Sequence, residues 1–370
     1  MKVLYVFRSL AFWGGIERIL VDKMNHLSAD FGYDVYMLTA DQGTHSMPYE
    51  LNSNIHFEDL NIRLHQQYNY RGARRLWEHI RLKRSFEAAL KERIDSIAPD
   101  VIACVATGYA DSIVKASGTT PVVVESHSTY MYTFEFGGLF QRLQANLLKK
   151  RLRLASAIVT LTEGDADKWR QHYPKVRVIP NMVNLNEKPL STQTSKRAIF
   201  VGRLDYQKQV LEALRLWAMI QQDFPDWTLD IYGEGEQSEM ALQAIREQKL
   251  NATLHKPTAR IQDCYRKSAF LISTSKYEPF GLVISEAMSC GLPAIAYDCP
   301  YGPAELISDG RDGFLVESND HETFARRMRQ LMGSQELRLE MGRHAAKAAQ
   351  CYAAERIMPA WKELFEELTR

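Results

Sequence analysis

Two sets of short apolar runs, each alternating with amphipathic helical patterns, constrain the fold of this 370-residue chain more than any other feature. Such runs have the length of buried strands, and strand–helix alternation places successive strands parallel in one sheet. The first set comprises residues 2–7, 35–39, 101–105, 122–125, 158–161 and 176–179, and the second comprises 198–201, 229–232, 253–255, 270–273 and 294–297. The sequence therefore predicts an α/β protein with two parallel sheets.

A polar segment separates the two sets. Residues 181–196 contain Pro189 and a patch rich in Ser and Thr, which is typical of a linker. After Asp320 the pattern is helical, and residues 359–365 carry large apolar groups that need a surface to bury. We predict an N-terminal domain over residues 1–185, a C-terminal domain over 186–352 and a final helix over 353–370.

Composition excludes several classes of protein. The 46 Lys and Arg residues nearly cancel the 45 Asp and Glu residues, so we expect no nucleic-acid partner. The five cysteines are widely spaced and lack the pairing of zinc sites, which favours reduced thiols. No apolar stretch approaches the roughly 18 residues that span a bilayer. We expect a protein that stays in the cytoplasm.

Residues 275–316 carry the strongest functional signal. Pro279 suits the first position of a helix, where a missing N–H has no cost, and Gly291 suits the helix end. We predict a helix from Pro279 through Ser289. Its first backbone N–H groups, near Phe280, Gly281 and Leu282, together with the positive end of its dipole, would form an anion site.

Two glutamates flank this predicted anion site. Glu278 and Glu286 would lie on nearly the same helix face, roughly 12 Å apart along the axis. A sugar, a diphosphate and a ribose laid end to end cover a similar span. One carboxylate would then hold sugar hydroxyls and the other ribose hydroxyls, with the diphosphate between them.

The same stretch is similar to a known signature. Ser275, Glu278, Phe280-Gly281 and Glu286, followed by Gly-Leu-Pro and an apolar strand, resemble the pattern of family 4 of retaining glycosyltransferases. That resemblance implies the GT-B fold, with two Rossmann-like domains facing a central cleft. It extends over essentially the whole chain, through Gly14, Gly15, Glu17, Pro180-Asn181 and Gly202-Arg203-Leu204 with Lys208.

The chain departs from the family pattern at two places. Met182 and Asn184 stand where the family often has glycine and aspartate, so the hinge there differs in detail. The loop Tyr301-Gly302-Pro303 with Glu305 resembles members that use UDP-hexoses or UDP-N-acetylhexosamines.

The resemblance assigns roles to individual side chains. Arg203 and Lys208 follow the strand at 198–201 and look like a clamp for the leaving diphosphate, at the sheet edge where open α/β sheets bind ligands. Without the resemblance, both would be interpreted as solvated loop charges. His127 follows the strand at 122–125 and, by resemblance, contacts the reacting sugar. A structural histidine is the alternative.

Glycines mark two further loops. Gly14 and Gly15 open a helix after the first strand, where backbone without Cβ lets a phosphate approach. Gly235 belongs to Gly-Glu-Gly-Glu, which lacks the third glycine of a dinucleotide fingerprint, so we expect this loop to border the nucleotide.

Asp165-Ala166-Asp167 imitates a metal-binding acid pair, but Thr162 before it predicts an ordinary helix N-terminus. We predict no metal site and no cofactor.

A basic segment leaves two interpretations open. Residues 139–154 contain five cations and no acid, with Arg142, Lys149 and Arg153 on one predicted helix face. The other face carries Phe140, Leu143, Leu147 and Leu154. Such a helix either lies on an anionic membrane or packs on the core with its cations in water. A second basic stretch comprises Arg71, Arg74, Arg75, Arg81, Lys83 and Arg84.

The sequence thus predicts a metal-independent, retaining glycosyltransferase with His127, Glu278, Arg203 and Lys208 as catalytic residues. Its donor would be a UDP-hexose or UDP-N-acetylhexosamine, and its acceptor a sugar, free or lipid-linked, in envelope polysaccharide, lipopolysaccharide or oligosaccharide synthesis at the inner face of the membrane. A nucleotide-sugar epimerase, a sugar phosphorylase and a non-catalytic sugar-binding module remain alternatives. Turnover without acceptor, or with inorganic phosphate, would reveal either of the first two.

Overall fold

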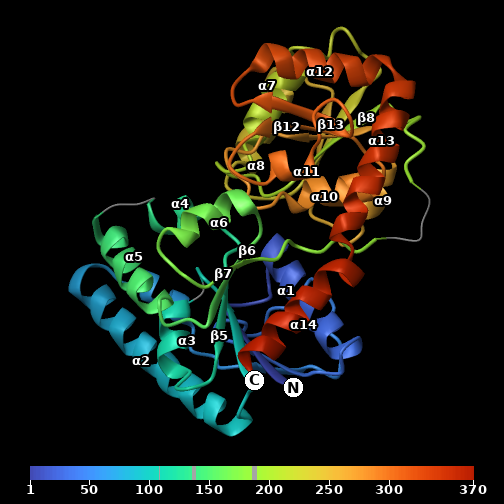
Figure 1. Cartoon of the computed structure of the whole chain (residues 1–370). Coiled ribbons are helices and arrows are strands. Elements are labelled where there is room, and N and C mark those ends of the chain that lie inside the picture. Colours follow the sequence, from blue (N-terminus) through green and yellow to red (C-terminus); the bar gives the residue numbers. More distant parts are fainter. Residues whose placement is uncertain (108, 136–138, 186–189) are drawn as a thin grey trace. The chain divides into compact units, whose positions relative to one another are not determined.

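The chain forms two compact units (Figure 1). The computed structural model describes residues 1–107, 109–135, 139–185 and 190–370, and the side chains of all of these except 139–144. Unit 1 comprises Met1–Ile179 and Ile357–Arg370, and unit 2 comprises Pro180–Arg356. The predicted boundary between residues 185 and 186 adjoins 186–189, which lie outside the described residues.

Unit 1 is built on a parallel sheet in the order β3-β2-β1-β4-β5-β6-β7. Every strand predicted for this half is present to within one residue. The edge strand β3 was not predicted, because His56 and Phe57 on it are exposed and give no apolar run. The strands are β1 (Lys2–Phe7), β2 (Asp34–Thr39), β3 (His56–Asp59), β4 (Val101–Val105), β5 (Val122–Glu125), β6 (Ala157–Thr160) and β7 (Val176–Val178).

Helices cover this sheet and enclose a core that includes the fully buried Trp169. Helix α2 is the long blue-to-cyan helix in Figure 1. The helices are α1 (Gly15–Ala29), η1 (Leu64–Asn69), α2 (Gly72–Ile97), α3 (Ala110–Ala116), α4 (Tyr130–Phe134), α5 (Leu139–Leu152) and α6 (Glu163–Arg170).

Unit 2 repeats the architecture with a parallel sheet in the order β10-β9-β8-β11-β12-β13. Its predicted strands are again present to within one residue, and β13 is an addition. The strands are β8 (Arg197–Val201), β9 (Thr228–Tyr232), β10 (Ala252–His255), β11 (Phe270–Ser273), β12 (Ala294–Asp298) and β13 (Gly313–Glu317). The helices are α7 (Val210–Ala218), α8 (Ser238–Glu247), α9 (Ile261–Arg266), α10 (Leu282–Ser289), α11 (Pro303–Leu306), α12 (His321–Gly333), α13 (Gln335–Ala349) and η2 (Gln350–Tyr352).

The two ends of unit 2 lie side by side. Val183 and Ala353 form an isolated parallel bridge, and the Val183 N–H donates to the Tyr352 carbonyl at 2.8 Å. Helix α14 (Ala354–Leu368) follows and buries Trp361 and Phe365.

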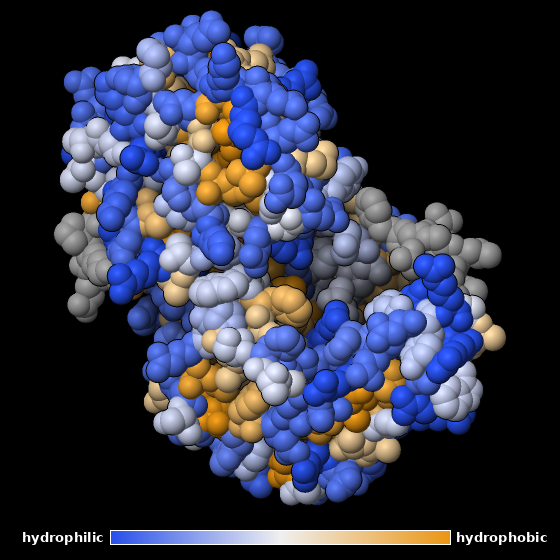
Figure 2. Space-filling view, turned by 180° about the vertical axis from the view of Figure 1, so that it is seen from behind, coloured by the Kyte–Doolittle hydropathy of each residue, from blue (hydrophilic) through white to orange (hydrophobic). Residues whose placement is uncertain are grey.

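On the face shown in Figure 2, the surface is mainly hydrophilic, with hydrophobic residues in small groups. Within the described residues, no helix combines the length and the apolar character that crossing a bilayer requires.

Candidate active site

The predicted site residues are divided between the units. Unit 1 carries three of them, namely Gly14, Gly15 and His127, and unit 2 carries the rest, namely Arg203, Lys208, Gly235, Glu278, Phe280, Gly281, Leu282 and Glu286.

Lys208 and Glu278 form a buried ion pair in unit 2. Lys208 lies between β8 and α7 and Glu278 follows β11, so two neighbouring strands bring the pair to their carboxyl ends. The side chains are only 15% and 5% exposed. The Ser275 hydroxyl donates to the same carboxylate oxygen, Oε1, at 2.7 Å. A cation and a carboxylate are therefore held together at the sheet edge where ligands of open α/β folds bind.

The loop after β8 shapes the position of Lys208. Asp205 Oδ1 accepts the backbone N–H groups of Gln207 and Lys208, each at 3.0 Å. A Cβ on Gly202 would lie 3.2 Å from Lys208 Cγ, so glycine lets the lysine stem lie against the backbone. Arg203 is 61% exposed and reaches Asp205 at 3.1 Å. Of the two predicted clamp cations, Lys208 is fixed and Arg203 is open to solvent.

The Gly-Glu-Gly-Glu loop packs directly on this clamp loop. The Leu204 N–H donates to the Glu234 carbonyl at 3.0 Å. A Cβ on Gly235 would lie 2.5 Å from the Leu204 carbonyl oxygen, so the close backbone approach requires glycine there. Contact of this loop with a nucleotide stays a prediction.

The predicted start of the helix at Pro279 is wrong. Helix α10 begins at Leu282, after Gly281 in the left-handed region at φ 97°. Glu278 is instead in extended backbone, because its N–H donates to the Pro300 carbonyl at 2.7 Å and its carbonyl accepts the Tyr301 N–H at 2.8 Å. This pairing holds Glu278 off the helix, so the argument that placed both glutamates on one helix face is also wrong.

Gly302 permits that pairing. A Cβ there would lie 1.9 Å from the Phe280 carbonyl oxygen. The Phe280 ring is buried and packs edge-on against Tyr352, with ring centroids 5.3 Å apart. Phe280 therefore anchors the segment, and the first turn of α10 offers the N–H groups of Leu282 and Val283.

Glu286 is the glutamate that does lie on α10. It is 4% exposed, and the fully buried Tyr265 hydroxyl donates to its Oε2 at 3.2 Å. This hydrogen bond orients the carboxylate. Its contact with a ribose stays a prediction.

In unit 1, Gly14 and Gly15 open α1 as predicted. Gly14 is the N-cap, and a Cβ there would lie 2.0 Å from Glu17 Oε2, so the side chain of Glu17 lies against the glycine. A cavity of about 200 Å³ adjoins this turn and is lined by Phe7, Arg8, Ser9, Phe12, Ile16, Glu17 and Thr107.

His127 belongs to a buried charged cluster. Glu125 Oε2 accepts from His127 Nε2 at 2.8 Å and pairs with the ammonium group of Lys23 from α1. That ammonium group lies 3.7 Å from the ring centroid of Trp361 on α14. The three side chains of the ion-pair cluster are 2–3% exposed. Burial raises the pKa of Glu125, but Lys23 and His127 outweigh it and hold that pKa below its usual value.

Sequence reasoning missed Lys23, Glu125 and Trp361. Lys23 falls among the buried positions 19, 20, 24 and 27 of α1, and a cation on an apolar helix face was the available signal. Burial lowers the pKa of Lys23, and Glu125 opposes the shift. His127 Nε2 is hydrogen-bonded to Glu125, and contact of the imidazole with a sugar stays a prediction.

The basic face predicted for residues 139–154 is not formed as expected. Helix α5 ends at Leu152, before Arg153, and Leu147 of the predicted apolar face is 64% exposed. The Lys149 ammonium group lies 5.0 Å from the Phe134 ring centroid, which draws it toward the protein. The side chain of Arg142 lies outside the described residues.

Asp165 is structural, as expected. It accepts from the Tyr130 N–H at 2.8 Å and from Trp169 Nε1 at 3.0 Å, and burial raises its pKa to about 6. Thr162 caps α6 by accepting the Asp165 N–H. The described part of the chain holds no cluster of three or more His, Cys, Asp or Glu residues suited to a metal ion.

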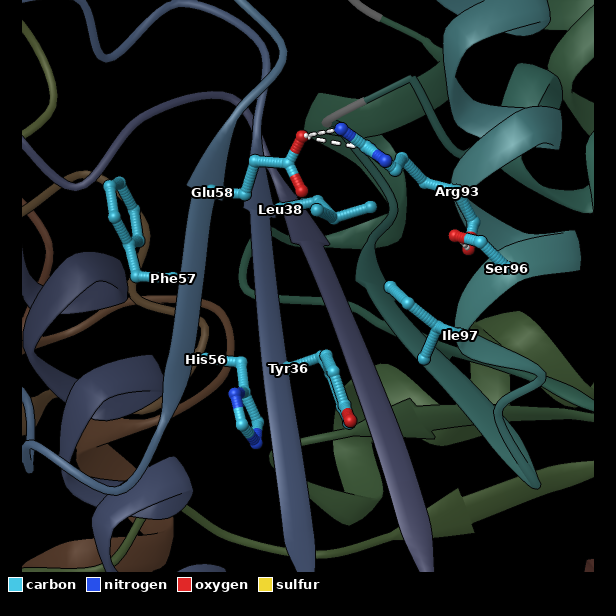
Figure 3. Close-up of a pocket in the computed structure, with 8 residues that line it drawn as sticks. All are labelled: Tyr36, Leu38, His56, Phe57, Glu58, Arg93, Ser96 and Ile97. Carbon is cyan, nitrogen blue, oxygen red and sulfur yellow. Dashed lines mark hydrogen bonds and ion pairs between the residues drawn. The ribbon is translucent and has the colours of Figure 1, made fainter.

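A larger cavity of about 310 Å³ lies at the β3 edge of unit 1, and none of its lining residues is a predicted donor residue (Figure 3). Glu58 of β3 and Arg93 of α2 face each other across it and form an ion pair at 2.6 Å. His56 stacks on Tyr36 with ring centroids 4.4 Å apart, and Phe57 points away. These contacts explain the side chains without a ligand.

Two parallel α/β units of this kind define the GT-B class of fold. Two family models match the sequence: Glycosyltransferase Family 4 over residues 13–187 and Glycosyl transferases group 1 over residues 183–348. The chain belongs to the family 4 glycosyltransferases with the GT-B fold.

Relatives extend this result. The chain is 34% identical over 57% of its length to an exopolysaccharide phosphotransferase of Streptomyces coelicolor, and 31% identical over 57% of its length to the amylovoran biosynthesis glycosyltransferase AmsD of Erwinia amylovora. The matches span 23% and 62% of those two proteins. A TarM mutant of S. aureus, solved with Fondaparinux, alpha-GlcNAc-glycerol and UDP, has the same fold, with a TM-score of 0.79, 16% identity, and coverage of 98% of this chain and 99% of TarM.

Proposed function

We propose that the protein transfers a hexose or an N-acetylhexosamine from a UDP-sugar to a sugar acceptor, with retention of anomeric configuration. The buried Lys208–Glu278 pair carries this proposal. Replacing a buried ion pair by apolar residues is often neutral for stability, so a pair kept at a ligand-binding edge favours a role in binding.

Lys208 would stabilise the leaving diphosphate. Its ammonium group has three N–H donors, of which Glu278 engages one, so two are left for phosphate oxygens. Negative charge on the diphosphate grows as the glycosidic bond breaks, and a cation already in place stabilises it without reorganisation. Arg203 would add a second cation from solvent. We propose metal independence because these side chains supply the charge that a metal ion would supply.

Glu278 would hold the sugar. Ser275 and Lys208 both donate to Oε1, so Oε2 would accept from a sugar hydroxyl. The carboxylate charge also favours an oxocarbenium-like transition state. The acceptor hydroxyl would attack on the side from which the diphosphate leaves, and the nearby diphosphate oxygen, gaining charge, would take its proton.

The nature of the substrates is proposed from the relatives. TarM was solved with UDP, and AmsD is named for amylovoran biosynthesis. We propose a UDP-sugar donor and an acceptor in envelope polysaccharide or oligosaccharide assembly, free or lipid-linked.

The test first compares the binding of different nucleotides and then measures sugar transfer. A ligand at a hundred times its dissociation constant stabilises a protein by about 2.7 kcal/mol, so UDP should raise the melting temperature more than GDP or ADP. Transfer from the matching sugar nucleotide should continue after exhaustive chelation. Lys208→Ala should lose transfer, while Lys267→Ala, at an exposed lysine of the same unit, should retain it. Stabilisation by no nucleotide, or equal activity of the two variants, would refute the proposal.

A further inference from the structure

The first turns of α2 stand free of the body of unit 1. All residues from 71 to 77 are exposed. The buried face of the helix begins at Glu78 and returns every four residues, at Leu82, Phe86, Leu90 and Ile94. The start of α2 therefore extends beyond the surface on which the rest of the helix packs.

Large apolar side chains gather on this free end. Leu76, Trp77 and Ile80 are 51%, 60% and 43% exposed, and helical spacing places Ile80 next to both of the others. Tyr68 of η1, 64% exposed, lies beside the start of α2, because the Arg75 guanidinium lies 4.7 Å from its ring centroid. A hydrogen bond of 2.7 Å between Gln67 and His79 fixes η1 against α2.

Three arginines lie on the other side of the same exposed segment, because positions 71, 74 and 75 face away from Leu76 and Ile80 at helical spacing. Within the ranges that the structure describes, Arg71, Arg74 and Arg75 have no carboxylate at ion-pair distance, whereas Arg81 pairs with Glu78 at 2.8 Å. Arg74 stacks on Tyr70 at 4.3 Å, which leaves its in-plane N–H donors for another acceptor. The free end of α2 is therefore both apolar and positively charged.

We propose that this α2 surface, formed by Arg71, Arg74, Arg75, Leu76, Trp77 and Ile80, docks on an anionic lipid bilayer. Guanidinium groups would bind lipid phosphates, Trp77 would lie at the headgroup level, and Leu76 and Ile80 would enter the acyl boundary. An anionic polymer would satisfy the arginines but would leave the exposed leucine, isoleucine and tryptophan in water. The combination of charge and apolar groups selects a membrane.

The experiment measures sedimentation of the full chain with vesicles, and it does not depend on catalysis. The protein should bind vesicles of phosphatidylglycerol and phosphatidylcholine at low salt, release as salt screens the charges, and ignore pure phosphatidylcholine. At about 1 kcal/mol per basic residue, the triple variant Arg71→Gln, Arg74→Gln, Arg75→Gln should bind about a hundredfold more weakly. Trp77→Ser should also weaken binding. The tryptophan emission of the protein, which has six tryptophans, should shift to the blue only with anionic vesicles, and this shift should be absent in Trp77→Ser.

A matched control removes the same charge elsewhere. Arg246, Lys249 and Arg260 are exposed cations of unit 2, and changing all three to glutamine should leave vesicle binding unchanged. Equal loss in both triple variants would show non-specific attraction and overturn the proposal. So would failure of the unaltered protein to bind anionic vesicles, or binding to soluble polyanions alone. Circular dichroism of each variant should match the unaltered protein.

Discussion

Lys23→Met should destabilise unit 1 severely, because it leaves Glu125 buried without its counter-charge. The Lys23 and Glu125 side chains are 3% and 2% exposed, and His127 would be the only remaining member of the cluster to donate to Glu125 Oε2. Breaking a buried pair by removing one partner costs about 3–5 kcal/mol. At about 2–4 °C per kcal/mol, the melting temperature should fall by about 6–20 °C. Calorimetry and tryptophan fluorescence measure this directly.

The stability that the Lys23–Glu125 pair contributes should fall at low pH. The pKa of Glu125 lies below its usual value in the folded protein, so the pair contributes stability above the unfolded pKa of about 4.3, and this contribution is lost as pH falls below it. The difference in unfolding free energy between the unaltered protein and Lys23→Met should therefore be full at pH 7 and shrink in acid.

Two controls separate burial from charge alone. Lys91→Met removes an exposed lysine whose pair with Asp95 is 54% and 59% exposed, and it should cost less than about 1 kcal/mol. Adding Glu125→Leu to Lys23→Met should recover stability, since an apolar pair replaces the unpaired charge. Equal losses for Lys23→Met and Lys91→Met, or no recovery in the double variant, would refute this reasoning.

Further predictions concern the unit 2 site. Lys208→Ala should lower turnover by about a hundredfold or more, and Arg203→Ala, at a solvent-exposed side chain, by about tenfold; steady-state kinetics decide this. Glu286→Ala should weaken UDP binding about ten- to a hundredfold in calorimetry, while Glu278→Ala should keep UDP binding and lose turnover. The opposite result would show that the donor binds in the reverse orientation. Gly302→Ala should cost about 1–3 kcal/mol in urea unfolding, because its Cβ would meet the Phe280 carbonyl, and a neutral change would contradict this.

Most of the fold was predictable because the central strands are buried on both faces. Runs such as 101–105 and 270–273 are entirely buried, and their apolar sequence follows directly. The edge strand β3 has a solvated face and gave no such run. Strand β13 was not predicted, because the α11 before it has only four residues and shows no helical pattern that would mark another strand–helix repeat.

The sequence pattern selected the candidate residues, whose roles stay predictions, but it did not predict their local geometry. The pattern singled out Glu278 and Lys208 separately, without predicting that they form an ion pair. It also misplaced the start of α10, because the pairing of Glu278 with Tyr301 is a contact between segments distant in sequence. The Lys23–Glu125–Trp361 cluster joins three parts of the chain and leaves only one local trace, a cation on an apolar helix face.

The bridge between Val183 and Ala353 bears on how the chain folds during synthesis. Unit 2 is continuous, whereas unit 1 is completed only by Ile357–Arg370, so Trp361 reaches Lys23 after all of unit 2 has been made. Joining the two parts of unit 1 while Pro180–Arg356 is unfolded has an entropic free-energy cost of about 4–5 kcal/mol. Once unit 2 has folded, the bridge holds its two ends together, and the segment acts as a short loop. Folding of unit 2 thus lowers the entropic cost of completing unit 1, and we expect helix α14 to join unit 1 after unit 2 has folded.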